Sequence, residues 1–430
     1  MSTAQAVRFV QSATVSDTPS VERHVKARVL DTLAAITAGY RQDGVDIVRD
    51  YARSRLGGDE ATLLDGSGTT LTTEGATLAN GIAANALDID DGHREVKGHP
   101  AAVVVPPALA VADAVEASIP EFLDAVFVGY ELAVRAGLAI HALDDVYTGT
   151  GSWGAVGAAA ATARLCEFSA QQTIHALSVA EYHAPRTPIM RGVEKPGMTK
   201  DGIGWGAYAG VVGAQLAQDG FTGAGTVFDD SDVTETLGAQ FHVTDGYFKP
   251  YPCCRWAQPG IDAVSTLMSQ HDIDSSNIES VRISTFEEAT HLRTRNPSTP
   301  EEAQYSYPYP VAATLVRGRF TQAEHAEEAR TDTEIRALAD RVEFTVDETL
   351  DARFPSECLA RVDIKTDDKT YQSDVTRASG SRDSALSSAE LREKTRQLVS
   401  PTLPPGAIKT IDKALDTDQP TSALLEPWSM

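Results

Sequence analysis

The sequence predicts a mainly α-helical protein with a smaller α+β region in its second half. Apolar residues recur at helical spacing through the first half, whereas apolar and polar residues alternate in places after about Tyr251. Helical spacing returns from Ser388. A chain of 430 residues is too long for one ordinary core. We therefore expect two domains, a helical one formed by residues 1–249 and 390–430, and an α+β one formed by residues 250–389.

The predicted helices of the first half are rich in alanine and glycine, which is typical of helices that pack closely on one another. They are Ser20–Tyr40, Thr73–Leu87, Pro106–Ala117, Pro120–His141, Gly154–Leu165 and Asp201–Gln218. In the last of these helices, Gly202, Gly204, Gly206 and Gly210 are interpreted as close-packing positions. They do not follow a strand and lack the spacing of a dinucleotide-binding loop.

The predicted strands are Ile278–Thr285 and Ala360–Thr366, in which apolar and polar residues alternate. The turn Asp367-Asp368-Lys369 follows the second strand, so Thr370–Val375 is expected to return as its hairpin partner. Tyr309–Val316 and Asp332–Val342 are expected to be helices between the strands. Together these elements predict an α+β fold for this part of the chain.

The chain is strongly acidic, with 37 lysines and arginines against 61 aspartates and glutamates, a net charge of −24. Such a surface repels nucleic acids and anionic membranes, so we expect neither as a partner. Because the excess acid is spread along the chain, we interpret it as a solvated coat suited to high salt. The first residues lack the apolar core of a signal peptide, and no charge-free apolar run has the length of a membrane span. We expect a cytoplasmic protein.

The four cysteines are too few for a disulfide scaffold, and Cys253-Cys254 does not have zinc-finger spacing. We interpret the pair as buried thiols, because a nucleophilic cysteine needs a nearby base that the sequence does not supply. GxSxG, Walker and HExxH motifs are absent from the sequence.

The most informative segment is LDIDDGHREVKGHP, from Leu87 to Pro100. Acids and imidazoles gather in it, directly before an almost wholly apolar run: Asp88, Asp90, Asp91, His93 and His99. Titratable groups beside a core-forming segment favour a partly dry pocket in which protons are transferred. A metal site is the second interpretation, because DxDDGH lacks EF-hand spacing and the gap between the histidines suits a loop better than a helix face.

Several cations lie near these motifs and could hold an anion. Lys200 stands just before an apolar helix, where its charge opposes the helix dipole, and this position favours a role in binding a carboxylate or donating a proton. The other candidate anion-binding residues are Arg94, Lys97, Arg191, Lys195 and, in FKPYPCCRWAQPGIDA, Lys249.

Taken together, these segments resemble the MmgE/PrpD family. The resemblance runs from HVKARVLDTLAAITAG through LDIDDGHREVKGHPAAVVVPPALAVAD, GSWGAVGAAAATARL, KDGIGWGAYAG and FKPYPCCRWAQPGIDA to YSYPYPVAATLVRGRF and LREKTRQLV. It implies a large all-helical domain completed by the C-terminal helices, a smaller α+β lid, a cleft between them and a homodimer. It also implies a small polycarboxylate substrate, with no metal and no organic cofactor.

The resemblance assigns roles to individual residues. Asp88 matches the first aspartate of the family's D-x-D-D motif, His99 its His-Pro histidine, and Lys200 the lysine before its Gly/Ala-rich helix, so these three are the predicted catalytic residues. Thr148 and Gln258 stand where the family often has histidines, and His93 or His183 could replace them. The predicted substrate-binding residues are His93, Arg94, Thr148, Arg191, Lys249 and Gln258.

The predicted function is that of a lyase which moves a proton at the carbon next to a carboxylate. His99 would be the acid or base, Asp88 would orient it or relay the proton, and Lys200 would bind a carboxylate. Dehydration and decarboxylation both fit this chemistry. Epimerisation of an amino- or imino-dicarboxylate and a divergent, non-catalytic dimer remain the alternatives.

Overall fold

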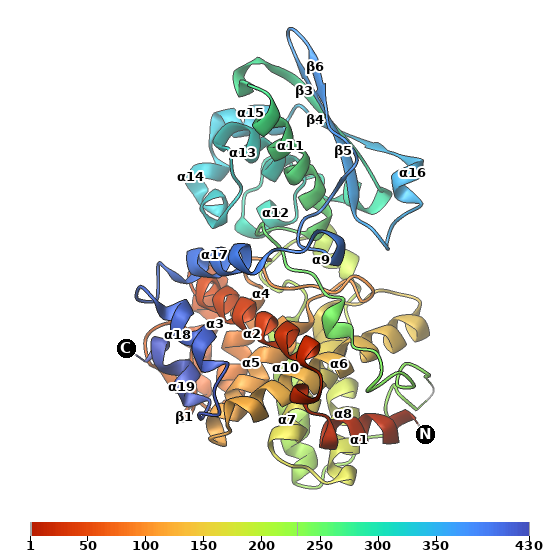
Figure 1. Ribbon diagram of the computed structural model, residues 1–430, viewed down its shortest axis with the longest axis vertical. Coiled ribbons are helices and arrows are strands. Elements are labelled where there is room, and N and C mark those ends of the chain that lie inside the picture. Colours follow the sequence, from red (N-terminus) through yellow and green to blue (C-terminus); the bar gives the residue numbers. More distant parts are fainter. Residues whose placement is uncertain (1, 230, 430) are drawn as a thin grey trace.

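The computed structural model describes residues 2–229 and 231–429, which form a mainly α-helical protein with a smaller α/β region (Figure 1). The helices of the first half are α1 (Ser2–Ser12), α2 (Pro19–Gly39), α3 (Asp43–Arg55), α4 (Thr73–Asn85), α5 (Pro100–Ala114), α6 (Ile119–Asp144), α7 (Thr150–Leu165), α8 (Ala170–His183), α9 (Ile189–Glu194) and α10 (Ile203–Gln218). A small hairpin of β1 (Gly57–Thr62) and β2 (Thr70–Leu71) lies between α3 and α4.

The close helix packing that the glycines predict is confirmed. A Cβ atom on Gly206 would lie 2.3 Å from the carbonyl oxygen of Gly151 in α7, and one on Gly210 would lie 2.6 Å from that of Ala155. A side chain at either position would push α10 away from α7. Gly202 has a different role, because it precedes α10 with a positive φ of 69°.

Helix α5 begins earlier than the sequence predicts. It starts at Pro100, and Pro106 and Pro107 lie inside it rather than at its beginning. The predicted helix begins at Pro106, whereas Pro100 already occupies the first helical position, where a missing N–H costs little. This correction places His99 at the N-cap of α5.

The α/β region contains a five-stranded sheet whose main order is β4-β3-β5-β6. Strands β3 (Ile278–Thr285) and β5 (Leu359–Thr366) are antiparallel, β6 (Thr370–Gln372) forms the predicted hairpin with β5, and β7 (Thr376–Arg377) also pairs with β5. Strand β4 (Val342–Val346) runs parallel to β3. The sequence prediction placed Val342 at the end of a helix, but α15 (Thr333–Ala339) stops before it.

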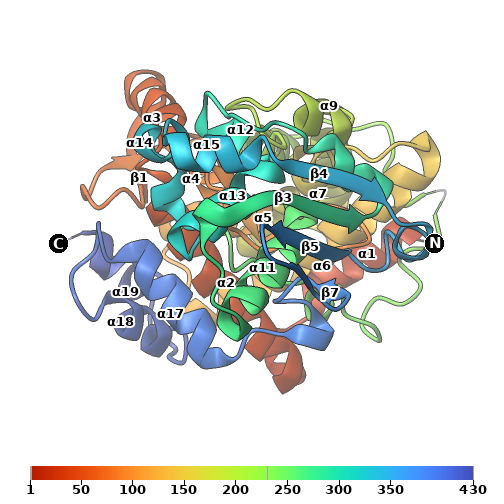
Figure 2. The ribbon, with the colours of Figure 1, turned by 90° about the horizontal axis from the view of Figure 1, so that it is seen from above.

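Two hydrophobic cores divide the molecule. The first joins α1–α8 and α10 to the C-terminal helices α17 (Ser388–Val399), α18 (Ala407–Ala414) and α19 (Ser422–Leu425), of which α17 packs beside α2 (Figure 1). The second lies between the sheet and helices such as α11 (Gln258–Gln270) and α13 (Pro308–Arg317). Viewed from above, the sheet lies over the helical region (Figure 2). The domain limits given above stay a prediction.

One helix of the described chain, α6, has the length and the apolar composition of a membrane span, with a mean hydropathy of 1.4 over its best window. Of that window, 78% is buried inside the protein, as in a core helix. The sequence does not predict a membrane span here because the segment contains charged residues, among them Glu131 and Arg135. In the structure these two side chains form an ion pair at 3.5 Å.

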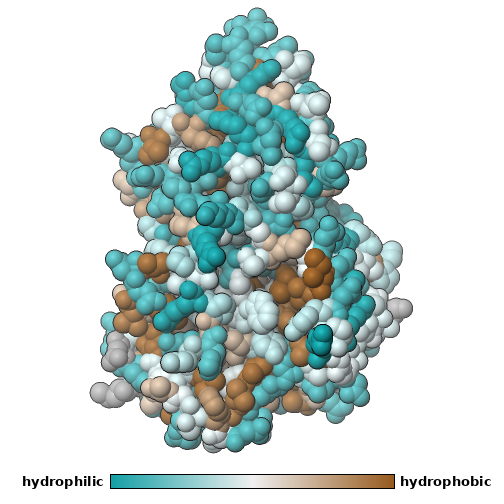
Figure 3. Space-filling view, turned by 180° about the vertical axis from the view of Figure 1, so that it is seen from behind, coloured by the Kyte–Doolittle hydropathy of each residue, from teal (hydrophilic) through white to brown (hydrophobic). Residues whose placement is uncertain are grey.

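The surface differs between the two regions. Seen from behind, the α/β region is mostly hydrophilic, while apolar patches gather over the helical region (Figure 3). Most of the large exposed apolar side chains belong to the helical region, among them Ile47, Tyr182 and Trp205. The predicted homodimer stays a prediction, and these side chains mark where a second copy should be sought.

Candidate active site

The segment that joins α4 to α5 is buried and fixed to a second segment that is distant in sequence. Gly92 and Tyr247 exchange two main-chain hydrogen bonds, of 3.0 and 2.8 Å. His93 donates its N–H to the carbonyl of Gly98 at 2.8 Å. The chain therefore holds Asp88 and His99, at the two ends of this segment, close to Lys249 from the other one.

His99 lies at the centre of a group of carboxylates. Its Nδ1 atom lies 2.8 Å from the carbonyl oxygen of Asp91 and 3.0 Å from Oδ2 of Asp90. Its Nε2 atom lies 3.7 Å from Asp88 Oδ1 and 3.8 Å from Asp201 Oδ2. Burial alone would lower the pKa of His99, but the carboxylates of Asp90 and Asp88 outweigh it and raise that pKa to about 9. At neutral pH this side chain is an imidazolium.

Asp90 is the carboxylate placed to orient His99, whereas Asp88, for which the sequence predicts orientation of the ring or relay of the proton, lies where only the second role fits. Asp90 contacts Nδ1 and is itself held by the Asn85 amide, which donates to it at 3.0 Å. Asp88 lies on the opposite side of the ring, near Nε2. Because Nδ1 is engaged, Nε2 is the nitrogen that can exchange a proton with a ligand.

Asp91 holds the segment in place rather than acting in the pocket. Its carboxylate accepts hydrogen bonds from the N–H of Ala101 at 3.0 Å and from the Tyr130 hydroxyl at 3.1 Å. The Arg28 guanidinium lies 3.7 Å away. Burial raises the pKa of Asp91 to about 6 despite Arg28.

Two lysines from distant parts of the chain converge on Asp88. Lys249 Nζ lies 3.1 Å from Asp88 Oδ1 and Lys200 Nζ lies 3.9 Å from it. Burial alone would raise the pKa of Asp88, but these two cations hold it well below its usual range. Lys200 also donates to Gln304 and lies 4.7 Å over the Tyr305 ring. Asp88 and Lys200 both have left-handed backbones, with φ of 52° and 46°.

Asp88, His99 and Lys249 lie in the wall of a pocket between the helical and α/β regions. The volume of this pocket is about 620 Å³ when the space at its open mouth is included. Its polar lining includes Asp88, His99, Asp201, Tyr247, Lys249 and Tyr305, and its other cations are Arg94, Lys97 and Arg255. Trp256, Phe354 and Cys358 supply apolar surface. Cys254 also lines the pocket, and burial raises the pKa of its thiol to about 12, as expected of an inert cysteine.

Arg94 has unused hydrogen-bonding capacity at this pocket. Its Nη2 atom donates to Ser381 Oγ at 3.2 Å. Its Nη1 atom is buried and has no hydrogen-bond partner among the residues that the structure describes. An arginine that lines a pocket and has an unpartnered donor is suited to bind a carboxylate.

Other predicted site residues lie outside this pocket. Thr148 bonds to His141, which accepts from the Thr148 N–H at 3.1 Å. Gln258 is buried behind the pocket wall and donates to the carbonyls of Tyr251 and Cys253, each at 3.0 Å. Arg191 lines an adjoining groove with Lys200, and His93 packs against His242. Within the described part of the chain, five predicted site residues do not line the pocket: His93, Thr148, Arg191, Lys200 and Gln258. A ligand in this pocket is therefore not expected to contact them directly.

Sequence reasoning missed several pocket residues. Asp201 follows Lys200 directly and could have been considered with it. Arg255 lies in the motif that contains Lys249, so the motif was noticed but this side chain was not. Tyr247 and Tyr305 carry no pattern that distinguishes them from core tyrosines. His183, named as a replacement imidazole, is exposed at the end of α8.

Asp88, Asp90 and His99 offer three ligand atoms within 4.8 Å of one another, which is close enough to suggest a metal ion. The charges argue against it. Lys249 and Lys200 already approach Asp88, and the His99 ring is an imidazolium, which cannot be a ligand until it loses a proton. The cluster is better suited to proton transfer.

Comparison with known proteins identifies the family of the chain. The MmgE/PrpD N-terminal domain matches residues 4–238, and the MmgE/PrpD C-terminal domain matches residues 251–417. The cis-aconitate decarboxylase-like protein oryM of Aspergillus oryzae is 25% identical over 98% of this chain and 96% of its own length. The cis-aconitate decarboxylase of Aspergillus terreus is 23% identical over 76% of this chain and 74% of its own length. The chain belongs to the MmgE/PrpD family, whose dehydratase and decarboxylase chemistry identifies it as an enzyme of the lyase kind.

Proposed function

We propose that the protein is a lyase that acts on a small di- or tricarboxylate by proton transfer at the carbon next to a carboxylate. The observation that carries this proposal is the position of His99, which lines a pocket together with several cations and has a pKa raised by the carboxylates around it. An acid with a proton to give, beside groups that hold anions, is what the reaction requires. The proposal needs no cofactor chemistry.

The charge of the pocket supports a polyanionic substrate. Arg94, Lys97 and Arg255 line it together with Lys249, in a chain whose net charge is −24. Lys249 is paired with Asp88, and Arg255 donates to Gln258, Ser381 and two main-chain carbonyls, so Arg94 and Lys97 are the candidates to bind substrate carboxylates. Lys200 does not line the pocket and is proposed to act through Asp88, whose charge it helps to neutralise.

Decarboxylation is the form of the reaction that this protonation state favours. The bond from the chain to one carboxylate carbon breaks, its electron pair stays on the chain carbon, and carbon dioxide leaves. The proton on His99 Nε2 then passes to that carbon, and solvent reprotonates the imidazole. This sequence needs one acid and no base, which suits a histidine with a pKa of about 9. The printed names of the relatives make cis-aconitate the first substrate to test.

Dehydration is the second candidate, and Asp201 is the reason to keep it. Burial raises the pKa of the Asp201 carboxyl, and its Oδ2 atom lies 3.8 Å from His99 Nε2. A carboxylate of raised pKa could remove a proton from carbon while His99 protonates the leaving hydroxyl. Return of the proton to the opposite face would instead give an epimerase.

The test is an NMR assay in D₂O at high salt with cis-aconitate, citrate, 2-methylcitrate and iminodisuccinate. Decarboxylation is expected to release carbon dioxide and leave one deuterium on the product, either on the carbon that lost it or, after the double bond shifts, on the carbon next to a remaining carboxylate. Dehydration would yield an alkene, and deuterium exchange without net product would indicate epimerisation. His99→Asn should abolish turnover, whereas His183→Asn, which changes an exposed histidine, should not. Binding of these compounds without turnover of any would refute the proposal in favour of a non-catalytic protein.

A further inference from the structure

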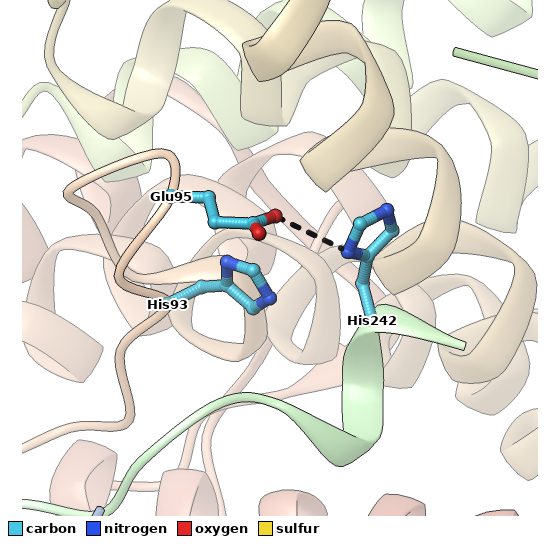
Figure 4. A group of neighbouring side chains, drawn as sticks. All are labelled: His93, Glu95 and His242. Carbon is cyan, nitrogen blue, oxygen red and sulfur yellow. Dashed lines mark ion pairs between the residues drawn. The ribbon is translucent and has the colours of Figure 1, made fainter. Parts of the chain in front are cut away.

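A second cluster of histidine and carboxylate lies outside the pocket and has no part in the proposed reaction. His93, Glu95 and His242 place one ligand atom each within 4.8 Å of one another (Figure 4). His93 and Glu95 come from the segment before α5, and His242 comes from the short 3-10 turn His242–Thr244. Figure 4 shows the Glu95 carboxylate and the His93 ring directed toward His242.

The His93 side chain is the unusual member of this cluster. It is 1% exposed, yet neither ring nitrogen makes a hydrogen bond of normal geometry to any residue that the structure describes. The main chain of His242 is its nearest polar neighbour. Burying an imidazole without partners costs free energy, so a ligand that satisfies it would stabilise the fold.

The geometry is close to that of a bound divalent ion. His242 Nδ1 lies 3.7 Å from Glu95 Oε2. Two ligands of a tetrahedral zinc ion, each about 2.0–2.1 Å from the metal, lie roughly 3.3 Å apart. The Glu95 side chain is 59% exposed and can move to close this gap, and water can reach the fourth position.

The arginines near this cluster are engaged by other groups, which weakens their repulsion of a cation. Arg135 is paired with Glu131 at 3.5 Å and donates to the Gln240 carbonyl at 2.8 Å. Asp245 lies near enough to raise the pKa of Glu95, so it adds negative charge on the side of the cluster. Arg28 and Arg94 act on His93 as well, and Arg28 lies 3.7 Å from the Asp91 carboxylate.

We infer that His93, Glu95 and His242 form a binding site for a first-row divalent cation such as Zn²⁺, with two imidazoles, one carboxylate and water as ligands. The ion would link the segment that carries Asp88 and His99 to the segment that leads to Lys249, next to the Gly92–Tyr247 bridge. Its role would be to stabilise these segments. The inference does not rest on the proposed reaction.

The experiment uses the full-length protein dialysed against EDTA and then titrated with Zn²⁺ by calorimetry and with Co²⁺ by its visible d–d absorption. We expect one equivalent to bind and the melting temperature to rise with Zn²⁺. His242→Ala and Glu95→Gln change partly exposed side chains, so they should fold, as circular dichroism will show, and weaken binding roughly tenfold or more. His183→Ala, at an exposed histidine outside the cluster, is the matched control and should bind like the wild type.

Three results would overturn the inference. If the wild type does not saturate at one equivalent, no built site exists. If a folded His242→Ala binds as tightly as the wild type, the ion lies elsewhere. Binding that survives in His242→Ala but is lost in His99→Asn would assign the ion to the Asp88, Asp90 and His99 cluster instead.

Discussion

Replacing Asp90 with asparagine should convert His99 from an acid into a neutral imidazole over most of the useful pH range. The Asp90 carboxylate lies 3.0 Å from Nδ1 and is the strongest of the groups that raise the pKa of His99 to about 9. Without it, burial and Lys249 act in the opposite direction, so the pKa should fall to the usual value of about 6.5 or lower. A fall of about 2.5 units corresponds to about 3 kcal/mol of lost preference for the protonated form.

The sign of the effect on activity follows from the role of His99 as an acid. In the wild type the active, protonated form predominates below pH 9 and is lost above it. In Asp90→Asn it should be lost above about pH 6.5. At pH 8 the protonated fraction should fall from about 0.9 to about 0.03, a loss of roughly 30-fold in kcat/KM, while the two proteins should differ little below pH 6.

Two measurements check this prediction. The pH profile of kcat/KM gives the position of the basic limb, and NMR of ¹⁵N-histidine-labelled protein titrates His99 without need of a substrate. Asp113→Asn changes a half-buried carboxylate that accepts hydrogen bonds from Thr62 and does not line the pocket, and should leave both curves unchanged. A basic limb that stays near pH 9 in Asp90→Asn would refute the reasoning.

Three further outcomes are expected. Lys249→Met should lower the free energy of unfolding, measured by urea titration, by about 3–5 kcal/mol, because it leaves Asp88 buried without its closest cation. The double variant that also carries Asp88→Asn should recover much of this loss. Arg94→Gln should raise KM for a polycarboxylate roughly tenfold with a smaller change in kcat, because Arg94 lines the pocket and has an unpartnered donor. An unchanged KM would show that Arg94 does not bind the substrate. Removing salt should lower the melting temperature, because the net charge of −24 is then less screened, and full stability in dilute buffer would contradict the expected salt requirement.

The parts of the fold that could be predicted are those in which local pattern and tertiary packing agree. β3 occupies the predicted residues, since its alternation matches one covered face, and α10 ends at Gln218 as expected. β4 was missed because its short run of residues follows a helix without a turn signal, and it is fixed by parallel pairing with β3. Such a partner is distant in sequence and leaves no local trace.

The same distinction applies to the site. Asp88 and His99 lie eleven residues apart and could be placed together from the sequence. That Lys249 rather than Lys200 is the closer cation to Asp88 depends on the Gly92–Tyr247 bridge, which no pattern shows. Gln258 was chosen from its family position alone, and the structure directs its amide toward main-chain carbonyls instead.

The left-handed backbones of Asp88 and Lys200 set a limit on how stable this protein can become. A non-glycine residue in that conformation costs about 1–2 kcal/mol, and the fold bears this cost at both positions where the side-chain charges meet. Glycine would relieve the strain at either position and would delete the charge. Random drift or laboratory selection for thermal resistance alone would therefore tend to erode the site, and only selection for turnover can retain both residues.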